Sequence, residues 1–219
     1  MSKLTLVIGN KNYSSWSLRA WLTMKQAGLE FAEIRIPLST PTFYQQVRQY
    51  SPSGQVPVLL DDDLTIWESL AICEYIAENF APYLWPEDRK AKAIARSVSH
   101  EMHANFFNLR SQMPMDCRGR YPGEGMKPDV QADVDRVSTI WRECRQKYGG
   151  NGDLLFGEFS IADAMFAPVV SRFITYGVKL GSVEQAYMDA IWSLPAINTW
   201  IDAAAVELEY LDRLSHSHD

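Results

Sequence analysis

The sequence has little of several features on which whole classes of function depend. Its cysteines, Cys73, Cys117 and Cys144, are odd in number and lack C-x-x-C spacing, which argues against a disulfide framework or a zinc ribbon. This pattern favours a reduced, cytoplasmic setting. No apolar run approaches the roughly 20 residues needed to span a bilayer, so no membrane partner is expected. The first residues lead directly into a predicted strand, without the apolar segment of a signal peptide.

Basic charge is also scarce. The chain carries 21 Lys and Arg against 27 Asp and Glu, a net charge of −6, and has no basic run. A nucleic-acid partner is therefore not expected. Internal repeats and low-complexity segments are absent as well. What remains is the composition of an ordinary globular protein, and 219 residues are enough for one large or two small domains.

Strand and helix patterns alternate in the first eighty residues and give way to helix alone afterwards. Strands are predicted at 3–9, 31–36, 55–60 and 64–67, with helices at 14–28, 40–49 and 68–80. Beyond a proline-rich linker at 82–88, helices are predicted at 89–115, 129–148, from 160 onward, 183–191 and 195–212. The sequence therefore predicts an α/β domain over 1–81 and an all-helical domain over 89–219.

The chain is organised around the junction between the first strand and the first helix. A Gly/Asn-rich turn ends at Ser14-Ser15, where the helix begins. Free backbone N–H groups and the positive end of a helix dipole meet there, which makes the junction suited to an anion. A serine at this position can serve only as a helix cap, or it can donate a hydrogen bond to a thiolate. Either Ser14 or Ser15 could make that contact.

Two further positions have both a structural and a functional interpretation. Pro57, after Val56, can be an ordinary trans proline at a strand edge, or it can turn the chain so that Val56 pairs its backbone with an extended ligand. Glu68-Ser69 opens the third helix. These residues can cap it, or Ser69 can hold a ligand carboxylate while Glu68 accepts from a ligand ammonium.

The long helix beyond the linker carries His100 and His103 at a spacing of three residues. A metal site needs a third ligand, and the other two histidines are in the C-terminal tail, so no metal is expected. Arg110 falls on nearly the same helical face as His103, so the two residues can line a pocket. Phe106 and Phe107 are interpreted as core or pocket wall.

Together these motifs resemble the soluble glutathione transferase superfamily over essentially the whole chain. The matching segments are Ser14-Ser15 at a strand-turn-helix junction, Gln55-Val56-Pro57-Val58, the helix from Glu68-Ser69 to Ile76, and the cap Phe159-Ser160-Ile161-Ala162-Asp163. The resemblance implies a thioredoxin-like domain followed by a helical bundle, with glutathione as co-substrate in the cleft between them. It also implies a homodimer.

The resemblance assigns roles to particular residues. Ser14 polarises the glutathione thiol, and a cis bond at Pro57 lets Val56 pair its backbone with the cysteinyl residue. Glu68 and Ser69 hold the γ-glutamyl end, and Ser15 and Gln55 complete the glutathione site. Related thioredoxins carry C-x-x-C at this helix start, where Ser14-Ser15-Trp16-Ser17 stands here, so thiol–disulfide exchange by the protein itself is not expected. The electrophile pocket is assigned to Trp16, His103, Phe106, Phe107 and Arg110.

The motifs are most similar to the serine-type zeta class, some members of which isomerise maleylacetoacetate. Two departures from that pattern are Trp16, where a cysteine is expected, and Glu68, where a glutamine is expected. Three hypotheses follow: a transferase that conjugates glutathione to a small electrophile, a glutathione-dependent cis-trans isomerase in which Arg110 steers a dicarboxylate, and a non-catalytic binding module on the same fold.

Overall fold

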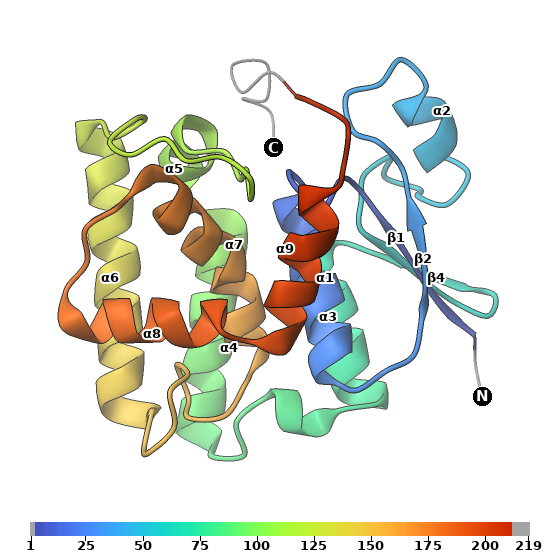
Figure 1. Cartoon of the computed structure of the whole chain (residues 1–219). Coiled ribbons are helices and arrows are strands. Elements are labelled where there is room, and N and C mark those ends of the chain that lie inside the picture. Colours follow the sequence, from blue (N-terminus) through green and yellow to red (C-terminus); the bar gives the residue numbers. More distant parts are fainter. Residues whose placement is uncertain (1–2, 212–219) are drawn as a thin grey trace.

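The computed structural model describes residues 3–211 and combines an α/β part with a helical part (Figure 1). A four-stranded mixed sheet has the order β2-β1-β3-β4, built from β1 (Leu4–Ile8), β2 (Ala32–Arg35), β3 (Val58–Asp61) and β4 (Leu64–Trp67). β1 runs parallel to β2 and antiparallel to β3, and β3 pairs antiparallel with β4. β1 lies between two other strands, and this central position explains why it is almost wholly apolar.

The two faces of this sheet pack against different helices. Leu6 and Ile8 of β1 belong to the main core, which includes α1 (Ser15–Gln26) and α3 (Ser69–Asn79). Val7 points to the opposite face and packs with Phe43 and Val47 of α2 (Phe43–Val47). The alternation follows from the two-residue period of a strand.

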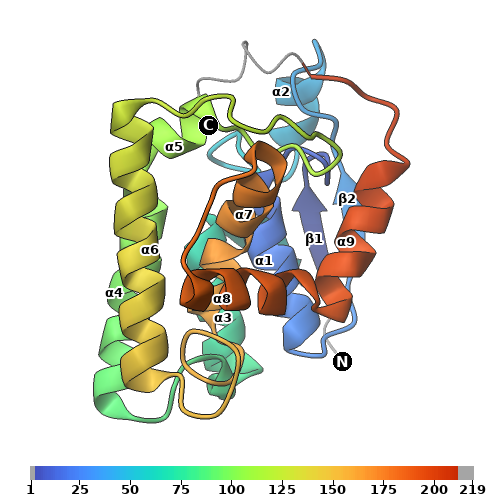
Figure 2. The same ribbon diagram turned by 60° about the vertical axis from the view of Figure 1, so that its left-hand side comes forward.

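The helical part begins with the short 3-10 helix η1 (Pro82–Leu84). It continues with α4 (Arg89–Ala104), α5 (Phe107–Gln112), α6 (Pro128–Tyr148), α7 (Ile161–Tyr176), α8 (Ser182–Trp192) and α9 (Pro195–Ala205). Almost every residue of α7 is buried, because this helix packs against α1, α4 and α8 in the middle of the molecule (Figure 2). The predicted capping box is confirmed: the Ser160 side chain and the Asp163 carboxylate satisfy each other's backbone N–H groups at the start of α7.

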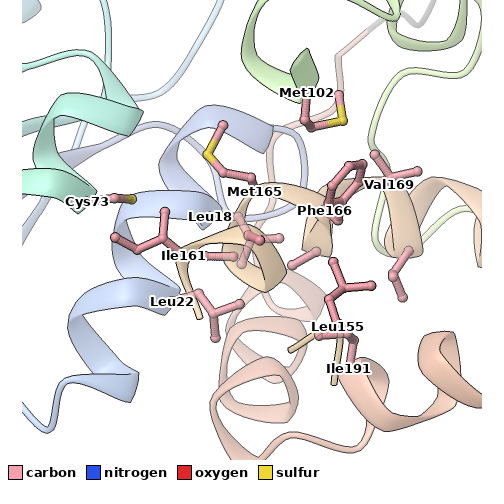
Figure 3. Close-up of a cluster of buried hydrophobic side chains, with 14 of the residues drawn as sticks. Leu18, Leu22, Cys73, Met102, Leu155, Ile161, Met165, Phe166, Val169 and Ile191 are labelled. Carbon is pink, nitrogen blue, oxygen red and sulfur yellow. The ribbon is translucent and has the colours of Figure 1, made fainter. Parts of the chain in front are cut away.

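One hydrophobic core joins the two parts. Leu18 and Leu22 of α1 lie beside Ile161 and Met165 of α7, and Cys73 of α3 lies in the same cluster (Figure 3). α1 therefore packs against the helical part, mainly on α7 and α9, and this packing fixes its position relative to that part. Within residues 3–211, no helix has the length and apolar character that crossing a bilayer requires.

Three predicted boundaries are corrected by the structure. The helix predicted over 89–115 is two helices, because Phe106 adopts a left-handed conformation (φ 62°) and inserts its side chain into the core. The helix predicted over 195–212 ends at Ala205, and the chain continues without helix through 206–211. The strand predicted from Gln55 begins at Val58, since Pro57 has no N–H for a sheet ladder. The exact limits of the two predicted domains stay a prediction, and the histidine-containing tail lies outside the described residues.

Candidate active site

Ser14 occupies the N-cap position of α1, as the sequence predicts. Its Oγ accepts a hydrogen bond from the N–H of Ser17 at 3.4 Å and donates one to Ser17 Oγ at 2.8 Å. The side chains of Ser14 and Ser15 are both nearly buried, so the first turn of α1 presents its amides at a sheltered place. This is the arrangement of hydroxyl, amides and helix dipole that favours an anion.

Ser17 is a site residue whose role the sequence analysis missed. Besides receiving the hydrogen bond from Ser14, its Oγ accepts the N–H of Gly9 at 3.0 Å. Gly9 directly follows β1, so this contact joins the end of the central strand to the first turn of α1. The signal in the sequence was the third serine of Ser14-Ser15-Trp16-Ser17, since serines at a helix start satisfy nearby backbone donors.

The Val56–Pro57 peptide bond is cis, which confirms the expectation drawn from the resemblance. Pro57 is buried, Val56 is half-buried and Gln55 is exposed. The N–H of Gln55 donates to Ser51 Oγ at 3.2 Å, so the turn before β3 is tied to the segment that precedes it. These three residues stand at the entrance to β3, and β3 pairs with β1 just before the Ser14 turn.

The start of α3 holds a buried hydroxyl without a hydrogen-bond partner. Ser69 is the first residue of this helix and is almost completely buried, and its Oγ makes no hydrogen bond to any part of the chain that the structure describes. Glu68 precedes it with φ 69° and ψ 123°, a backbone conformation that L-residues rarely adopt. Buried polar groups are normally satisfied, and strained residues concentrate at functional sites. Both features indicate that the start of α3 is built for a ligand.

Three of the predicted pocket residues come together around one indole ring. The imidazole of His103 packs edge-to-face on Trp16 with ring centroids 5.2 Å apart, and the guanidinium of Arg110 lies 5.3 Å from the centre of the Trp16 ring. His103 Nε2 also lies 3.8 Å from Glu68 Oε2, which connects the cluster to the start of α3. Of the other two, Phe106 is 5% exposed and packs in the core, whereas Phe107 is 59% exposed on α5.

The surroundings of His103 lower the pKa of its imidazole. Burial lowers the pKa of the His103 imidazole, and the positive charges of Arg19 and Arg110 act in the same direction, against the opposing effect of Glu68. An ordinary histidine already has a pKa of about 6.5, so a lowered value leaves the ring neutral at pH 7. His103 is therefore available as a neutral hydrogen-bonding group rather than as a cation.

Arg19 is a second residue that the sequence analysis did not single out. It is fully buried, its guanidinium lies 4.1 Å from the centre of the Trp16 ring, and its Nε donates to the carbonyl of Met165 at 3.1 Å. Neither Nη1 nor Nη2 has a hydrogen-bond partner within residues 3–211. Burial lowers the pKa of Arg19 well below its usual value, and the charges of Arg172 and Arg110 lower it further. The available signal was an arginine inside an otherwise apolar helical stretch.

The cluster around Trp16 is thus electropositive and lies one residue from the Ser14-Ser15 pair. Arg19 of α1 and Arg110 of α5 both lie over the Trp16 ring, and the positive charges of Arg110 and of Arg172 on α7 each lower the pKa of Arg19. Like charges gathered in a sheltered place favour an anion between or beside them. Among residues 3–211, no group of three or more His, Cys, Asp and Glu side chains is placed to hold a metal ion.

Comparison with known proteins identifies similar sequences for both parts of the chain. Residues 13–79 match the family model for the glutathione S-transferase N-terminal domain, and residues 127–203 match that for the C-terminal domain. A maleylacetoacetate isomerase of Mus musculus is 37% identical over 169 residues, which cover 76% of each chain. A glutathione S-transferase of Arabidopsis thaliana is 27% identical over 196 residues, 84% of this chain and 72% of that protein.

Solved structures confirm the fold. A glutathione transferase homolog from Burkholderia GL BGR1, crystallised with bound glutathione, superposes with a TM-score of 0.72 at 22% identity. The superposition covers 94% of this chain and all of that one. A Tau class glutathione S-transferase from mango gives a TM-score of 0.70 at 18% identity, over 93% of this chain and 96% of that one.

Proposed function

This chain belongs to the glutathione transferase superfamily, and on that premise we propose that it binds glutathione and activates its thiol as the thiolate for attack on a small electrophile. Ser14 is the catalytic residue of the proposal, because its hydroxyl can donate to the sulfur. The observation that carries the proposal is the position of this buried hydroxyl at the N-cap of α1, beside the free amides of the first turn.

The energy required is within reach of these groups. Lowering a thiol pKa from about 8.5 by two units needs roughly 2.7 kcal/mol of preference for the anion. One hydrogen bond to a charged acceptor contributes about 1.5–3 kcal/mol, and a helix terminus adds about 0.3–1 kcal/mol. Nucleophile activation and positioning then suffice for conjugation, with no covalent enzyme intermediate.

Other residues of the proposed site would hold the glutathione tripeptide in place. The unpartnered Ser69 Oγ and the amides at the start of α3 would receive the γ-glutamyl carboxylate, and Glu68 its ammonium. The backbone of Val56, beside the cis bond to Pro57, would pair with the cysteinyl residue. Ser15 and Gln55 complete the site. The electrophile would lie against Trp16, His103 and Arg110, with Phe107 at its edge.

A direct test compares wild type with Ser14→Ala in the glutathione complex. Ultraviolet titration gives the pKa of the bound thiol, and an arylating electrophile gives the conjugation rate. We expect Ser14→Ala to raise the thiol pKa by about 1.5 units and, because the thiolate fraction falls, to slow conjugation at pH 7 about tenfold. The matched control is Ser97→Ala, which removes an exposed hydroxyl of α4. Equal thiol pKa values and rates in all three proteins contradict the role of Ser14, and no glutathione binding by calorimetry favours a non-catalytic module.

The electropositive cluster favours a second candidate, glutathione-dependent isomerisation of a dicarboxylate such as maleylacetoacetate. Arg110 would steer one carboxylate, with Arg19 and Arg172 adding to the field. Arg110→Gln should then reduce turnover of the dicarboxylate at least tenfold while conjugation of an uncharged electrophile stays within about threefold. Absence of turnover in wild type ends this candidate and leaves the transferase.

Two further expectations stay predictions for this chain. A homodimer would appear in light scattering as twice the 24.9 kDa of the chain. A cytoplasmic location would appear in fractionation of the source cells.

A further inference from the structure

The turn that presents Ser14 is held by one backbone carbonyl from within. Asn10 O accepts the N–H of Ser14 at 2.8 Å and the N–H of Tyr13 at 3.2 Å. Lys11 and Asn12 lie between Asn10 and Tyr13 in the sequence, and their N–H groups donate to an acceptor outside the turn. Whatever accepts these two donors fixes the turn and, with it, the position of Ser14.

The acceptor is a carboxylate from the opposite end of the chain. Glu207 Oε1 accepts the N–H of Lys11 at 2.7 Å, and Glu207 Oε2 accepts the N–H of Asn12 at 3.0 Å. The Glu207 side chain is 6% exposed. Figure 1 shows how this arises: after α9, the C-terminal segment passes beside the turn between β1 and α1. Two consecutive amides on one carboxylate form a pair of strong, charge-assisted hydrogen bonds.

Further contacts join the segment that carries Glu207, and α9 before it, to the same turn. Arg118 Nη1 donates to the carbonyl of Glu207, and Arg118 Nη2 donates to the Tyr13 hydroxyl at 3.0 Å, so the same guanidinium joins the C-terminal segment to the turn. Trp200 Nε1 of α9 donates to Lys11 O at 2.8 Å. The turn is therefore held by α9 and the segment beyond it as well as by its own backbone contacts.

We propose that Glu207 is a positioning residue for Ser14, holding the β1–α1 turn so that the Ser14 hydroxyl and the first amides of α1 meet the sulfur of glutathione. This inference rests on the proposed function. Its physical basis is that small displacements of a catalytic group reduce rate steeply, about 100-fold for 1 Å. The carboxylate acts through geometry, because its negative charge by itself opposes a thiolate nearby.

The direction in which the thiol pKa changes therefore distinguishes a loss of charge from a loss of position. Loss of the charge alone would lower the pKa of the bound thiol, whereas loss of position raises it. The experiment compares Glu207→Gln with Glu209→Gln in the full-length protein with glutathione bound. Both carboxylates lie near Arg35, at 3.7 Å for Glu207 and 2.8 Å for Glu209, but the Glu209 side chain is not the acceptor for either amide of the turn. Glu209→Gln is therefore a matched control.

For Glu207→Gln we expect the thiol pKa to rise by about one unit and kcat at pH 7 to fall about tenfold, with KM for glutathione within about twofold of wild type. For Glu209→Gln, kcat should stay within about twofold of wild type, and the thiol pKa should stay within about 0.2 units of it. Glu207→Asp keeps the charge but shortens the side chain, so it should change the thiol pKa in the same direction as Glu207→Gln, and it carries the test if Glu207→Gln does not fold.

Three results would overturn the inference: an unchanged or lowered thiol pKa in the Glu207 variants, equal losses in Glu209→Gln, or a fall in thermal stability with kcat preserved. Ser14→Ala separates these from failure of the proposed function. If Ser14→Ala loses activity and Glu207→Gln does not, only the positioning role is wrong. If Ser14→Ala keeps full activity, the proposed function and this inference both fail.

Discussion

The hydroxyl of Ser14 donates its proton to Ser17 Oγ over 2.8 Å, and Ser17 Oγ also accepts the N–H of Gly9. In this arrangement the Ser14 proton is directed along the first turn of α1. Donation to a bound sulfur therefore requires the Ser14 hydroxyl to rotate away from Ser17. The exchange replaces one neutral hydrogen bond, worth about 1 kcal/mol, with one to a charged acceptor, worth about 1.5–3 kcal/mol.

Ser17→Ala tests this relationship. The substitution leaves the buried N–H of Gly9 without an acceptor, and we expect the free energy of unfolding to fall by about 1–3 kcal/mol in urea denaturation. Conjugation should stay within about threefold of wild type, because Ser14 keeps its own donor. A loss of activity as large as that of Ser14→Ala would instead identify Ser17 as the group that contacts the sulfur.

Unlike Ser17→Ala, a substitution at Arg19 is not expected to lower the free energy of unfolding. A buried guanidinium with two unpartnered nitrogens, repelled by Arg110 and Arg172, is costly to bury. We expect Arg19→Met to be at least as stable as wild type in urea denaturation, because an apolar side chain of similar length fills the same space. The contrast is Arg118→Met, which removes the contacts to Tyr13 and the C-terminal segment and should be less stable than wild type. A strongly destabilised Arg19→Met would show that the charge has a partner that offsets its burial.

The pKa of His103 should depend on Trp16. Burial is the first cause of the lowered pKa of the imidazole, and Trp16 packs against that ring. In Trp16→Ala the imidazole gains solvent, so its pKa should rise toward 6.5. Titration of the imidazole protons by NMR measures the change, with His100, exposed on the same helix, as the internal control. Equal His103 pKa values in the two proteins would contradict this explanation.

The sequence predicted the parts of this site that depend on local pattern. Ser14 at a helix start, Val56-Pro57 before a strand and Glu68-Ser69 at another helix start are short motifs, and each lies where predicted. The break between α4 and α5 was missed because the apolar periodicity continues through Phe106, and the helix is interrupted only by the backbone of Asn105, which is extended, and of Phe106, which is left-handed. Glu207 has no local signal at all. Its partners are 196 and 195 residues away, and only the packing of α9 on α1 brings them together.

Asp163 gives a pH dependence that can be isolated by one substitution. Its carboxylate is fully buried and accepts the N–H of Leu155 at 3.1 Å, and the N–H and hydroxyl of Ser160 at 2.8 Å each. Burial nevertheless raises the pKa of Asp163 to about 6, because the hydrogen bonds offset only part of the desolvation. In the unfolded chain its pKa is about 3.9.

The sign follows from proton binding. Between pH 4 and pH 6 the folded state keeps the proton that the unfolded state loses, so the contribution of Asp163 to stability is present below pH 4 and declines as the pH rises to 6. A difference of about two units corresponds to about 3 kcal/mol. In Asp163→Asn this decline is absent, although the amide accepts fewer of the three hydrogen bonds and lowers stability at every pH. Urea denaturation of both proteins from pH 3.5 to pH 7 measures the difference between the two curves. We expect the advantage of wild type over Asp163→Asn to shrink by about 3 kcal/mol across this range, whereas an advantage that grows with pH would mean that the hydrogen bonds hold the pKa of Asp163 below its usual value.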